Sequence, residues 1–460
     1  MQYKTMTNNL TNIKQYFETG ATKSYQFRKQ QLQKLAAAIS KYEKDISEAL
    51  QKDLGKSEAE SYATEIAMVQ MEINFMLKHL KKLMKPTTVS TNMLNIPSSS
   101  KIYYDALGVV LIIAPWNYPF QLAFTPLIGA TAGGNCAVIK PSEYTPATSM
   151  VIEKIVKEIF DEQYIFVVQG NGAEVVPALI NNFRFNHIFF TGSITVGKAV
   201  YEMAAKQLIP VTLELGGKSP CVVEDDAAIT VAAKRIAMGK FLNVGQTCIA
   251  PDYLLIHEAV KEKFVTALIN TIEKFYTKNA ALSEDYGKIV SEKRFDVLQK
   301  FLNDGEIIYG GNTDKSKLYI QPTIMQHVPL DAALMTEEIF GPILPIYTFN
   351  TQEEALKIIN RNPYPLAFYI FTNSTTKEAK WIDAVSFGGG CVNNTTYHFS
   401  NHHFPFGGIG FSGIGAYHGK KSFYTFTHAK PVLKTATWFD PSIKYPPFRG
   451  KLKWMKMFLK

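Results

Sequence analysis

The stretch that decides the fold is Gly-Val-Val-Leu-Ile-Ile-Ala at 108–114, followed by a second apolar run, Cys-Ala-Val-Ile-Lys, at 136–140. Both runs are short and continuously apolar, which is typical of strands buried on both faces. Similar runs follow at 164–169, 187–190 and 211–215, with helix-like stretches at 147–160 and 196–208. Strands that alternate with helices predict an α/β fold built on a parallel, doubly covered sheet.

The chain before this core has a different pattern. Residues 25–84 carry apolar side chains at helical spacing, as at Leu32, Leu35 and Ile39, and Pro86 ends that block. The segment that follows, up to residue 100, is rich in Ser, Thr and Asn. We expect it to leave the main body instead of joining its core.

The composition limits the class of protein. With 460 residues, 46% of them hydrophobic and 19% charged, the chain is an ordinary globular protein of about three domains or subdomains. The net charge is +9, but the basic residues are scattered up to about residue 430, so a nucleic-acid-binding protein is not expected. The start of the chain has no apolar signal region, and no apolar run reaches the ~18 residues of a membrane span. We expect a soluble, cytoplasmic protein.

The cysteines and histidines predict no metal site. The four cysteines are Cys136, Cys221, Cys248 and Cys391. They are far apart and form no Cys-x-x-Cys pair, which favours a reducing compartment and argues against disulfides or a cysteine zinc site. Cys136 and Cys221 lie in apolar runs and are expected to be buried and inert. His398, His402 and His403 are interpreted as loop residues, because no cysteine or carboxylate at metal-ligand spacing accompanies them.

The loops after the predicted strands carry specific residues, and parallel sheets bind ligands at that edge. The loops are Ala-Pro-Trp-Asn-Tyr-Pro at 114–119, Lys-Pro-Ser-Glu at 140–143 and Thr-Gly-Ser-Ile-Thr-Val-Gly-Lys at 191–198. The third matches the start of a P-loop, but Ala199 stands where a magnesium-binding Ser or Thr belongs. A nucleotide hydrolase is therefore not expected, although the loop can place a pyrophosphate at a helix N-terminus.

A carboxylate and a thiol frame the next stretch, which opens with Glu-Leu-Gly-Gly-Lys-Ser-Pro at 214–220 and closes with Gly-Gln-Thr-Cys at 245–248. The thiolate is the reactive form of cysteine, and a free thiol titrates near pKa ~8.5. A catalytic site must therefore lower that pKa or supply a base. Glu214 and Cys248 are candidates for base and nucleophile. On spacing alone, a helix-capping glutamate and a buried structural cysteine remain the alternative.

Together these motifs resemble the aldehyde dehydrogenase superfamily, in particular its class 3, or fatty-aldehyde, branch. The likeness covers roughly residues 25–447 and includes Pro-Phe-Gly-Gly-Ile-Gly-Phe-Ser-Gly-Ile-Gly-Ala-Tyr-His-Gly-Lys-Lys-Ser-Phe at 405–423. It implies a Rossmann-like NAD-binding domain at 1–84 and 104–212, an α/β catalytic domain at 213–412 and a small β bridging arm for oligomerisation at 85–103 and 413–434. Proteins of this branch are typically homodimers, so we expect the arm to pair with a second subunit's sheet.

The resemblance also implies the catalytic roles. Cys248 is expected to attack an aldehyde carbon, and Asn117 to hold the resulting oxyanion together with the Cys248 backbone amide. Glu214 is expected to activate the water that releases a carboxylate from the thioester. A CoA-acylating dehydrogenase would share Cys248 and Asn117 but generally lacks such a glutamate. A non-catalytic relative would be expected to have lost Cys248 or Glu214, and both are present.

The cofactor implied by the resemblance is NAD. Lys140 and Glu143 correspond to the pair that grips the adenosine ribose, and a carboxylate there would repel a 2′-phosphate, although some members of this branch accept NADP. The other implied cofactor residues are Trp116, Gly192, Ser193, Gly197, Glu338 and Phe340. Gly192 and Ser193 are expected at the pyrophosphate, and Glu338 and Phe340 at the nicotinamide ribose and ring. Phe406 and His418 are tentative lining residues of the substrate funnel.

The tail at 435–460 is basic and amphipathic, and it ends in Phe-Arg-Gly-Lys-Leu-Lys-Trp-Met-Lys-Met-Phe-Leu-Lys at 448–460. At helical spacing one arc, interrupted only by Lys451, contains Phe448, Leu452, Trp454, Met455, Phe458 and Leu459. Such a helix is typical of a peripheral contact with an anionic membrane surface. The alternative is a lid that covers the substrate funnel within the dimer. Both interpretations remain open.

Overall fold

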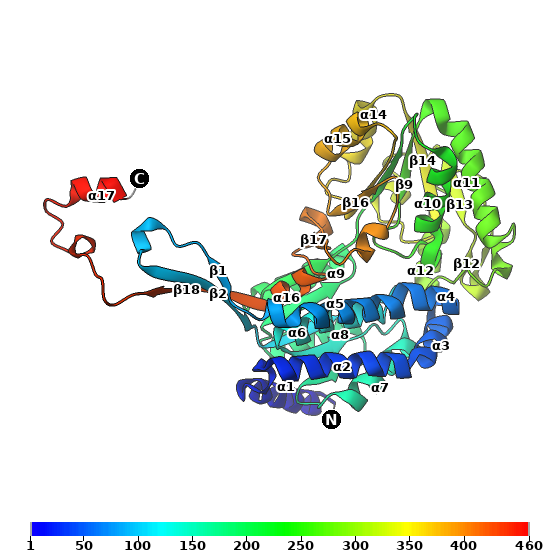
Figure 1. The fold of residues 1–460 in the computed structure, drawn as a ribbon. Helices are drawn as coiled ribbons and strands as arrows, with labels where there is room; N and C mark the ends of the chain where they lie inside the picture. The colour runs from blue at the N-terminus through cyan, green and yellow to red at the C-terminus, as the bar shows by residue number, and fades with distance from the viewer. Residues whose placement is uncertain (1, 459–460) are drawn as a thin grey trace.

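The computed structural model describes residues 2–458, and the side chains of residues 6–457. Two β-sheets form the body of the protein, and a third, three-stranded sheet projects from it as an arm (Figure 1). This arrangement confirms the fold class predicted from the sequence, an α/β protein with a Rossmann-like domain, a second α/β domain and a small β arm.

The first sheet has the strand order β17-β7-β6-β3-β4-β5, and every pairing is parallel except that of β17 with β7. Its strands are β3 (Val109–Ile113), β4 (Cys136–Lys140), β5 (Ile165–Val167), β6 (His187–Thr191), β7 (Val211–Glu214) and β17 (Gly413–Ile414). The five parallel strands coincide with the five apolar runs. Every residue of β3 and β4 is buried, which explains why these strands are continuously apolar.

The helices of this half pack on the sheet and on one another. They are α1 (Gln2–Glu18), α2 (Tyr25–Lys41), α3 (Glu43–Leu54), α4 (Glu58–Ser61), α5 (Ala67–Leu83), α6 (Gln121–Gly133), α7 (Pro146–Ile159), α8 (Gly172–Asn182), α9 (Ile194–Ala205) and α16 (Lys420–Thr425). The predicted helical block at 25–84 is divided into α2 to α5, with a π-turn at Tyr62–Ile66. Helix α6 is buried along its whole length, and a Cβ at Gly129 would lie 2.8 Å from Ser422 on α16. Glycine therefore lets these two helices pack closely.

The strand order places a topological switch point between β3 and β6. The chain proceeds from β3 through β4 to β5 on one side, and then returns to β6 and β7 on the other side. The loops that follow β3 and β6 therefore leave in opposite directions and open a crevice at the carboxyl ends of the strands. Residues 114–120 and 192–193 lie there.

The second sheet has the order β10-β13-β14-β9-β8-β15-β16, and it is parallel except for the pairing of β10 with β13. Its strands are β8 (Pro220–Val223), β9 (Tyr253–His257), β10 (Glu306–Tyr309), β13 (Thr323–Gln326), β14 (Ile343–Phe349), β15 (Ala367–Phe371) and β16 (Gly389–Val392). Its helices are α10 (Ile229–Phe241), α11 (Lys261–Tyr276), α12 (Glu292–Phe301), α13 (Ala333–Thr336), α14 (Gln352–Ile359) and α15 (Thr375–Ala384). A small hairpin pairs β11 (Thr313–Asp314) with β12 (Tyr319–Ile320).

The projecting arm consists of β1 (Thr87–Val89), β2 (Ser98–Ala106) and β18 (Thr427–Thr435), all antiparallel. Residues 413–426, which the sequence assigned to the arm, lie on the body instead, because β17 pairs with β7 and α16 packs on α6. Beyond the arm, α17 (Leu452–Phe458) lies apart from the body in Figure 1. Within residues 2–458, no helix has both the length and the apolar character needed to cross a bilayer.

Candidate active site

Cys248 lies in a loop between the short 3-10 helix Leu242–Gly245 and β9. The backbone there is unusual, because Asn243 and Val244 have φ angles of 51° and 56°. Left-handed conformations of this kind cost non-glycine residues free energy and persist where the surroundings hold them. The Asn243 side chain supplies part of that support, since its Nδ2 donates to the backbone carbonyls of Asn117 at 2.8 Å and Gln246 at 3.2 Å.

Asn117 ties the loop after β3 to the cysteine loop. Its side-chain Nδ2 donates to the carbonyl of Gln246 at 3.0 Å, and its own carbonyl accepts from Lys56 Nζ at 3.0 Å. A side-chain amide has two N–H groups, so one remains for a ligand beside Cys248. Asn117 is buried, and this bond holds its amide against the backbone just before the cysteine. The geometry suits a preorganised donor.

A buried ion pair also contacts the loop after β3. Lys56 Nζ lies 2.5 Å from Glu65 Oε1, and both side chains are fully buried. The second carboxylate oxygen of Glu65 accepts from the backbone amides of Phe120 and Gln121, at 2.9 and 3.0 Å. Neither charged residue was predicted to be functional. They lie in an amphipathic helical block, and nothing in its sequence pattern separates them from surface charges.

Glu214 ends β7 with a buried carboxylate that has no hydrogen-bond partner on either oxygen among the described residues. Burial raises the pKa of Glu214 well above its ordinary value. A buried polar group without a partner is costly and is usually satisfied by water or a ligand. Because Glu214 lines the same cavity as Cys248, it is placed to accept a proton there.

The Cys248 thiol is held in its protonated form. Burial raises its pKa, and the nearby carboxylates of Glu338 and Glu214 raise it further. The backbone amides of Cys248 and Ile249 act in the opposite direction, but the net shift is upward. This thiol therefore needs a base or an incoming positive charge before it can act as a nucleophile.

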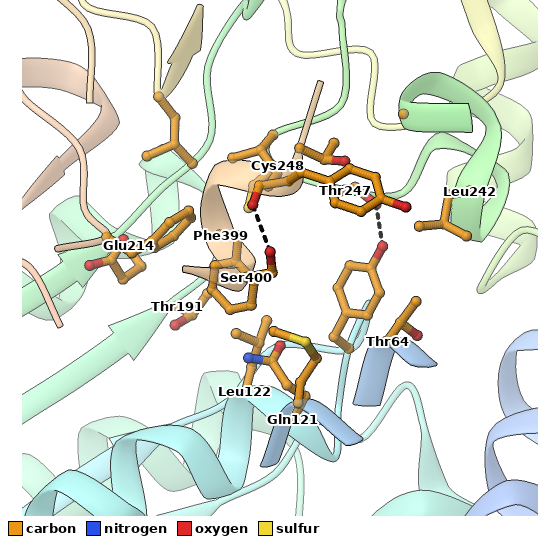
Figure 2. Close-up of a pocket in the computed structure, with 18 of the residues that line it drawn as sticks. Thr64, Gln121, Leu122, Thr191, Glu214, Leu242, Thr247, Cys248, Phe399 and Ser400 are labelled. Atoms are coloured by element: carbon orange, nitrogen blue, oxygen red, sulfur yellow. Dashed lines mark hydrogen bonds between the residues drawn. The ribbon is translucent and has the colours of Figure 1, made fainter. Parts of the chain in front are cut away.

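A largely apolar cavity of about 340 Å³ opens in front of the thiol. Figure 2 shows Cys248 and Thr247 on one side of it, Leu122 and Gln121 opposite, and Glu214 at one end. Its apolar and aromatic walls include Met68, Tyr118, Leu122, Met238, Leu242, Ile249, Leu366, Tyr397, Phe399, Phe406 and Tyr417. Phe406 thus lies where the sequence placed it. His418 is not among the lining residues and instead packs against Glu72.

A second cavity, of about 580 Å³, meets the first at Thr191, Glu214 and Cys248. It lies at the switch point between β3 and β6. Five of the residues predicted to bind the cofactor line it, namely Trp116, Gly192, Ser193, Glu338 and Phe340. The sequence had assigned these residues to one ligand, and tertiary structure brings them to one cavity.

The N-terminus of α9 borders this second cavity. Ser193 is its N-cap and accepts from the Val196 amide at 3.4 Å, so the next amides of the first turn face the cavity. A Cβ at Gly192 would lie 2.6 Å from the Phe190 ring, and one at Gly197 would lie 2.5 Å from Leu215. Glycine at these positions keeps the helix close to the sheet, which suits a pyrophosphate at the helix end.

Lys140 and Glu143 form a pair outside the lining of that cavity. Lys140 Nζ is buried and donates to Glu143 Oε2 at 2.9 Å and to the Pro141 carbonyl at 2.7 Å. Glu143 also accepts from the Gly172 amide at 2.8 Å. Burial raises the pKa of Glu143, but the Gly172 amide and Lys140 outweigh it and hold that pKa below its usual value. Glu143 is therefore a carboxylate at neutral pH.

Glu338 reaches the cavity because residue 216 has no side chain. A Cβ at Gly216 would collide with the Glu338 carboxylate. Burial, followed by the charge of Asp252, raises the pKa of Glu338 to about 8. Phe340 meets the Trp116 ring edge-on, with centroids 5.2 Å apart.

Three charged residues that sequence reasoning missed hold the segment around Glu338. Lys218 forms a buried ion pair with Asp252, which accepts from the Ile339 amide at 3.0 Å. Arg294 donates to the Glu338 carbonyl at 3.3 Å. A signal for Lys218 was available, since it stands between glycines and a serine in the 214–220 motif. No comparable sequence motif surrounds Asp252 or Arg294.

The remaining cysteines and histidines lie outside this site. All four cysteines are free thiols. Cys136 and Cys221 are buried, and burial raises the pKa of Cys136 to about 12. Cys391 lies 3.6 Å from His398 Nδ1. His402 lies beside His418 and Glu72, a carboxylate that the sequence spacing did not connect with them.

Comparison with known proteins identifies the family. A sequence model of the aldehyde dehydrogenase family matches residues 2–432. The chain is 49% identical to the 4,4'-diaponeurosporen-aldehyde dehydrogenase of Staphylococcus aureus, over 97% of both chains. It is 41% identical to aldehyde dehydrogenase family 3 member A2 of Rattus norvegicus, over 99% of this chain and 94% of the relative. A solved structure described as the substrate-bound state of Staphylococcus aureus AldH superposes with a TM-score of 0.96 and 47% identity, over 98% and 99% of the two chains. Because the family model and these relatives span nearly the whole chain, this protein belongs to the aldehyde dehydrogenase family and is an oxidoreductase that acts on aldehydes.

Proposed function

We propose that this aldehyde dehydrogenase oxidises apolar aldehydes of medium or long chain to carboxylic acids, with NAD as the oxidant. The observation that carries the proposal is the meeting of two cavities at Cys248 and Glu214. One cavity has apolar walls, and the other is bordered by a helix N-terminus and polar groups. An aldehyde in the first and a dinucleotide in the second would both reach the thiol.

The walls of the first cavity support an apolar substrate. Leu122, Leu242 and Phe399 surround the space in front of Cys248 (Figure 2). Each Å² of apolar surface removed from water contributes roughly 25 cal/mol to binding, so a longer hydrocarbon chain would bind more tightly. The Staphylococcus aureus relative is named for 4,4'-diaponeurosporen-aldehyde, which makes large aldehydes the first to test.

The protein's own groups provide the covalent chemistry. After losing its proton to solvent, the Cys248 sulfur would attack the aldehyde carbon to form a thiohemiacetal. The free N–H of Asn117 and the Cys248 amide would hold the oxyanion, and one such donor is typically worth ~2.7–4 kcal/mol of barrier. When bound in the second cavity, nicotinamide supplies the hydride acceptor for oxidation to the thioester. Glu214 would then deprotonate the water that hydrolyses this thioester.

The family uses nicotinamide dinucleotides, and we infer a preference for NAD over NADP. Glu143 is a carboxylate, held by Lys140 and the Gly172 amide. A 2′-phosphate on the ribose beside it would meet a like charge. The ribose hydroxyls of NAD would instead hydrogen-bond to the carboxylate.

A substrate panel tests this function. NADH fluorescence with aldehydes from short aliphatic to long polyene, each with NAD and with NADP, should show kcat/KM rising with apolar chain length and higher with NAD. Cys248→Ser should abolish turnover while leaving NAD affinity nearly intact. Preference for short polar aldehydes or for NADP would refute the corresponding half of the proposal. Turnover that requires added CoA would support an acylating dehydrogenase instead.

We also propose that the arm builds a homodimer. Eight of the nine residues of β18 are exposed, and β18 pairs with β2 on one edge. The catalytic sheet ends in β16, which pairs only with β15 among the described strands. Unpaired edges invite strand addition, so β18 would extend the β16 edge of a partner. Sedimentation velocity should show a dimer for the parent chain. The double variant Val432→Lys with Leu433→Lys should sediment as a monomer. An unchanged sedimentation coefficient would contradict this interface.

We further propose that the enzyme is cytoplasmic and that its C-terminal tail contacts an anionic membrane surface. Phe448, Leu452, Trp454 and Met457 are each more than half exposed, so the described part of the chain does not bury them. The side chain of Phe458 and residues Leu459 and Lys460, which complete the predicted apolar and basic faces, lie outside the described residues. Apolar side chains among lysines suit a peripheral contact with an anionic membrane. A lid would have to cover a partner's cavity, since α17 lies apart from this body (Figure 1).

A further inference from the structure

A second cluster of ligand-type side chains lies near the substrate cavity but outside it. Glu72 comes from α5, His402 from the loop that follows the 3-10 helix Tyr397–Ser400, and His418 from the segment before α16. One ligand atom from each of them lies within 4.8 Å of the other two. Glu72 and His418 are buried, and the His402 side chain is 10% exposed.

The two oxygens of Glu72 have different surroundings. Oε1 accepts from the Gly419 amide at 2.9 Å and from the Ser422 hydroxyl at 3.4 Å. Oε2 faces the histidines, 3.4 Å from His402 Nε2 and 3.7 Å from His418 Nε2. Among the described residues, neither Oε2 nor His402 Nε2 has a hydrogen-bond partner. Two buried polar atoms are therefore aimed at one point without satisfying each other.

Backbone groups also lie near both imidazole rings, that of Ser400 near His402 and that of Asn401 near His418. A histidine that donates one N–H to a carbonyl presents the lone pair of its other nitrogen, and metal-ligating histidines are usually held in this way. With both rings in that tautomer, three acceptor atoms face one another, an arrangement that needs a cation or a proton between them.

We propose that Glu72, His402 and His418 bind a divalent transition-metal ion of the zinc class. Imidazole nitrogens and a carboxylate oxygen are zinc ligands with bonds of ~2.0–2.2 Å, so a tetrahedral site has edges of about 3.3–3.6 Å. The two distances from Glu72 Oε2 to the histidine nitrogens are close to that value. The fourth position is left for water. This site is separate from Cys248 and goes beyond the proposed oxidation.

Binding requires a small movement of one ring. The rings of His402 and His418 stack, with centroids 4.7 Å apart and planes at 26°. An ion shared by both nitrogens must lie near both ring planes, so one ring has to turn. His402 is the ring with room to do so, because it lies in a loop and is partly exposed, whereas His418 is enclosed.

The ion would connect two walls of the substrate cavity. Tyr397 and Phe399, just before His402, line one wall, and Thr64 and Met68, just before Glu72, line another. A bond from His402 through the ion to Glu72 would fix the loop at 396–402 against α5. If the substrate is an apolar aldehyde, as proposed above, the ion should change KM for long aldehydes more than kcat.

The binding test uses the full chain carrying Cys248→Ser, which removes the reactive thiol as a competing ligand. Titration calorimetry with Zn²⁺ should show one ion bound per chain, and Co²⁺ should give a visible absorption spectrum of nitrogen and oxygen coordination without thiolate. Glu72→Gln and His402→Asn should each weaken binding at least tenfold. His403→Asn is the matched control, because His403 is the exposed neighbour and not a ligand.

The proposal is overturned if the parent takes up no Zn²⁺, or if Glu72→Gln and His402→Asn bind it as tightly as the parent. A cluster that merely shares a proton would give the first of these results. Should Glu72→Gln fail to fold, His402→Asn decides, since its position is in a loop. Hydrogen exchange at 396–404 should slow on adding Zn²⁺ in the parent and not in His402→Asn. None of these measurements needs turnover. They therefore test the metal site even if the proposed oxidation of apolar aldehydes is wrong.

Discussion

Glu214 and Cys248 lie at the boundary between the two cavities, and burial raises the pKa of both groups. A raised pKa makes the Glu214 carboxylate a stronger base, which suits the removal of a proton from water. Both carboxylate oxygens of Glu214 lack a hydrogen-bond partner among the described residues, so they are free to accept from the water that would hydrolyse the thioester. At the residue scale, we propose that Glu214 accepts a proton from water in the deacylation step.

Glu214→Gln should therefore slow thioester hydrolysis more than the steps before it. The amide keeps the shape of the carboxylate but cannot take a proton from water. Rapid mixing should show a burst of NADH, near one per active site, followed by steady turnover at least a hundredfold below the parent, within the ~10²–10⁴ range of general-base catalysis. A lost burst with little change in steady turnover would assign Glu214 another role.

Cofactor binding should lower the pKa of the Cys248 thiol. The nicotinamide of NAD is cationic, and a positive charge within ~4 Å stabilises a thiolate by about 4 kcal/mol at an effective dielectric of 20. The environment of this partly exposed thiol already raises its pKa, and a nearby positive charge would act against that shift. Alkylation by iodoacetamide should rise with pH, and saturating NAD should move that profile to lower pH.

Labelling of the Cys248→Ser variant corrects for Cys391, the other cysteine that is not fully buried. A pH profile that NAD leaves in place, or moves to higher pH, would contradict the electrostatic account. NADH, whose nicotinamide is neutral, is the matched control and should shift the profile less.

At the scale of elements, the loop after β3 depends on helices from the first hundred residues. Lys56 and Glu65 form a buried pair that contacts both the Asn117 carbonyl and the first turn of α6. Removal of one partner of a buried pair leaves an unpaired charge and typically costs ~3–5 kcal/mol. The pair therefore links the stability of the helical layer to the position of the Asn117 amide.

Lys56→Met should lower both the unfolding midpoint and kcat. Glu65 loses its counter-charge, and the Asn117 carbonyl loses a donor. The double variant Lys56→Met with Glu65→Gln should recover part of the stability, because no unpaired charge remains. Thermal unfolding and steady-state kinetics measure the two effects. If Lys56→Met leaves both quantities unchanged, the pair does not position Asn117.

At the scale of the whole molecule, the arm and the tail both present surface that suits a partner. The arm carries an open edge strand, and the tail carries exposed Trp454 and Met457 among basic residues. Both features are costly for an isolated monomer in water. They become favourable when a second subunit or a lipid surface covers them.

A chain that ends at Pro447 should bind anionic vesicles at least tenfold more weakly than the full chain at low salt. Each basic residue near an anionic surface contributes on the order of 1 kcal/mol, and the apolar side chains add to this. Vesicle co-sedimentation measures the difference, with neutral vesicles as the control. Equal binding of the two chains would contradict the membrane contact. A selective loss of activity on long aldehydes in the truncated chain would support the lid.

Much of the fold was predictable because it is encoded locally. The runs around Val109 and Cys136 are apolar at every position, and such runs form buried parallel strands wherever they occur. The same is true of Ser193, whose loop precedes a helix in sequence and caps α9 in the structure. The arm boundary at Thr427 was not predictable. Whether 413–426 leaves the body depends on β7 and α6, which lie far away in the chain.

The sequence by itself determined the α/β fold, and its family motifs predicted the roles of Cys248, Glu214 and Asn117 and the residues expected around the cofactor. Tertiary structure decided that Lys56 and Glu65 support Asn117, that His418 faces Glu72 instead of the substrate, and that two cavities meet at the thiol. The physical reason is range. Strand and helix patterns depend on neighbours within a few residues, whereas these contacts join segments that become close only after the helical layer, the two sheets and the loops have packed together.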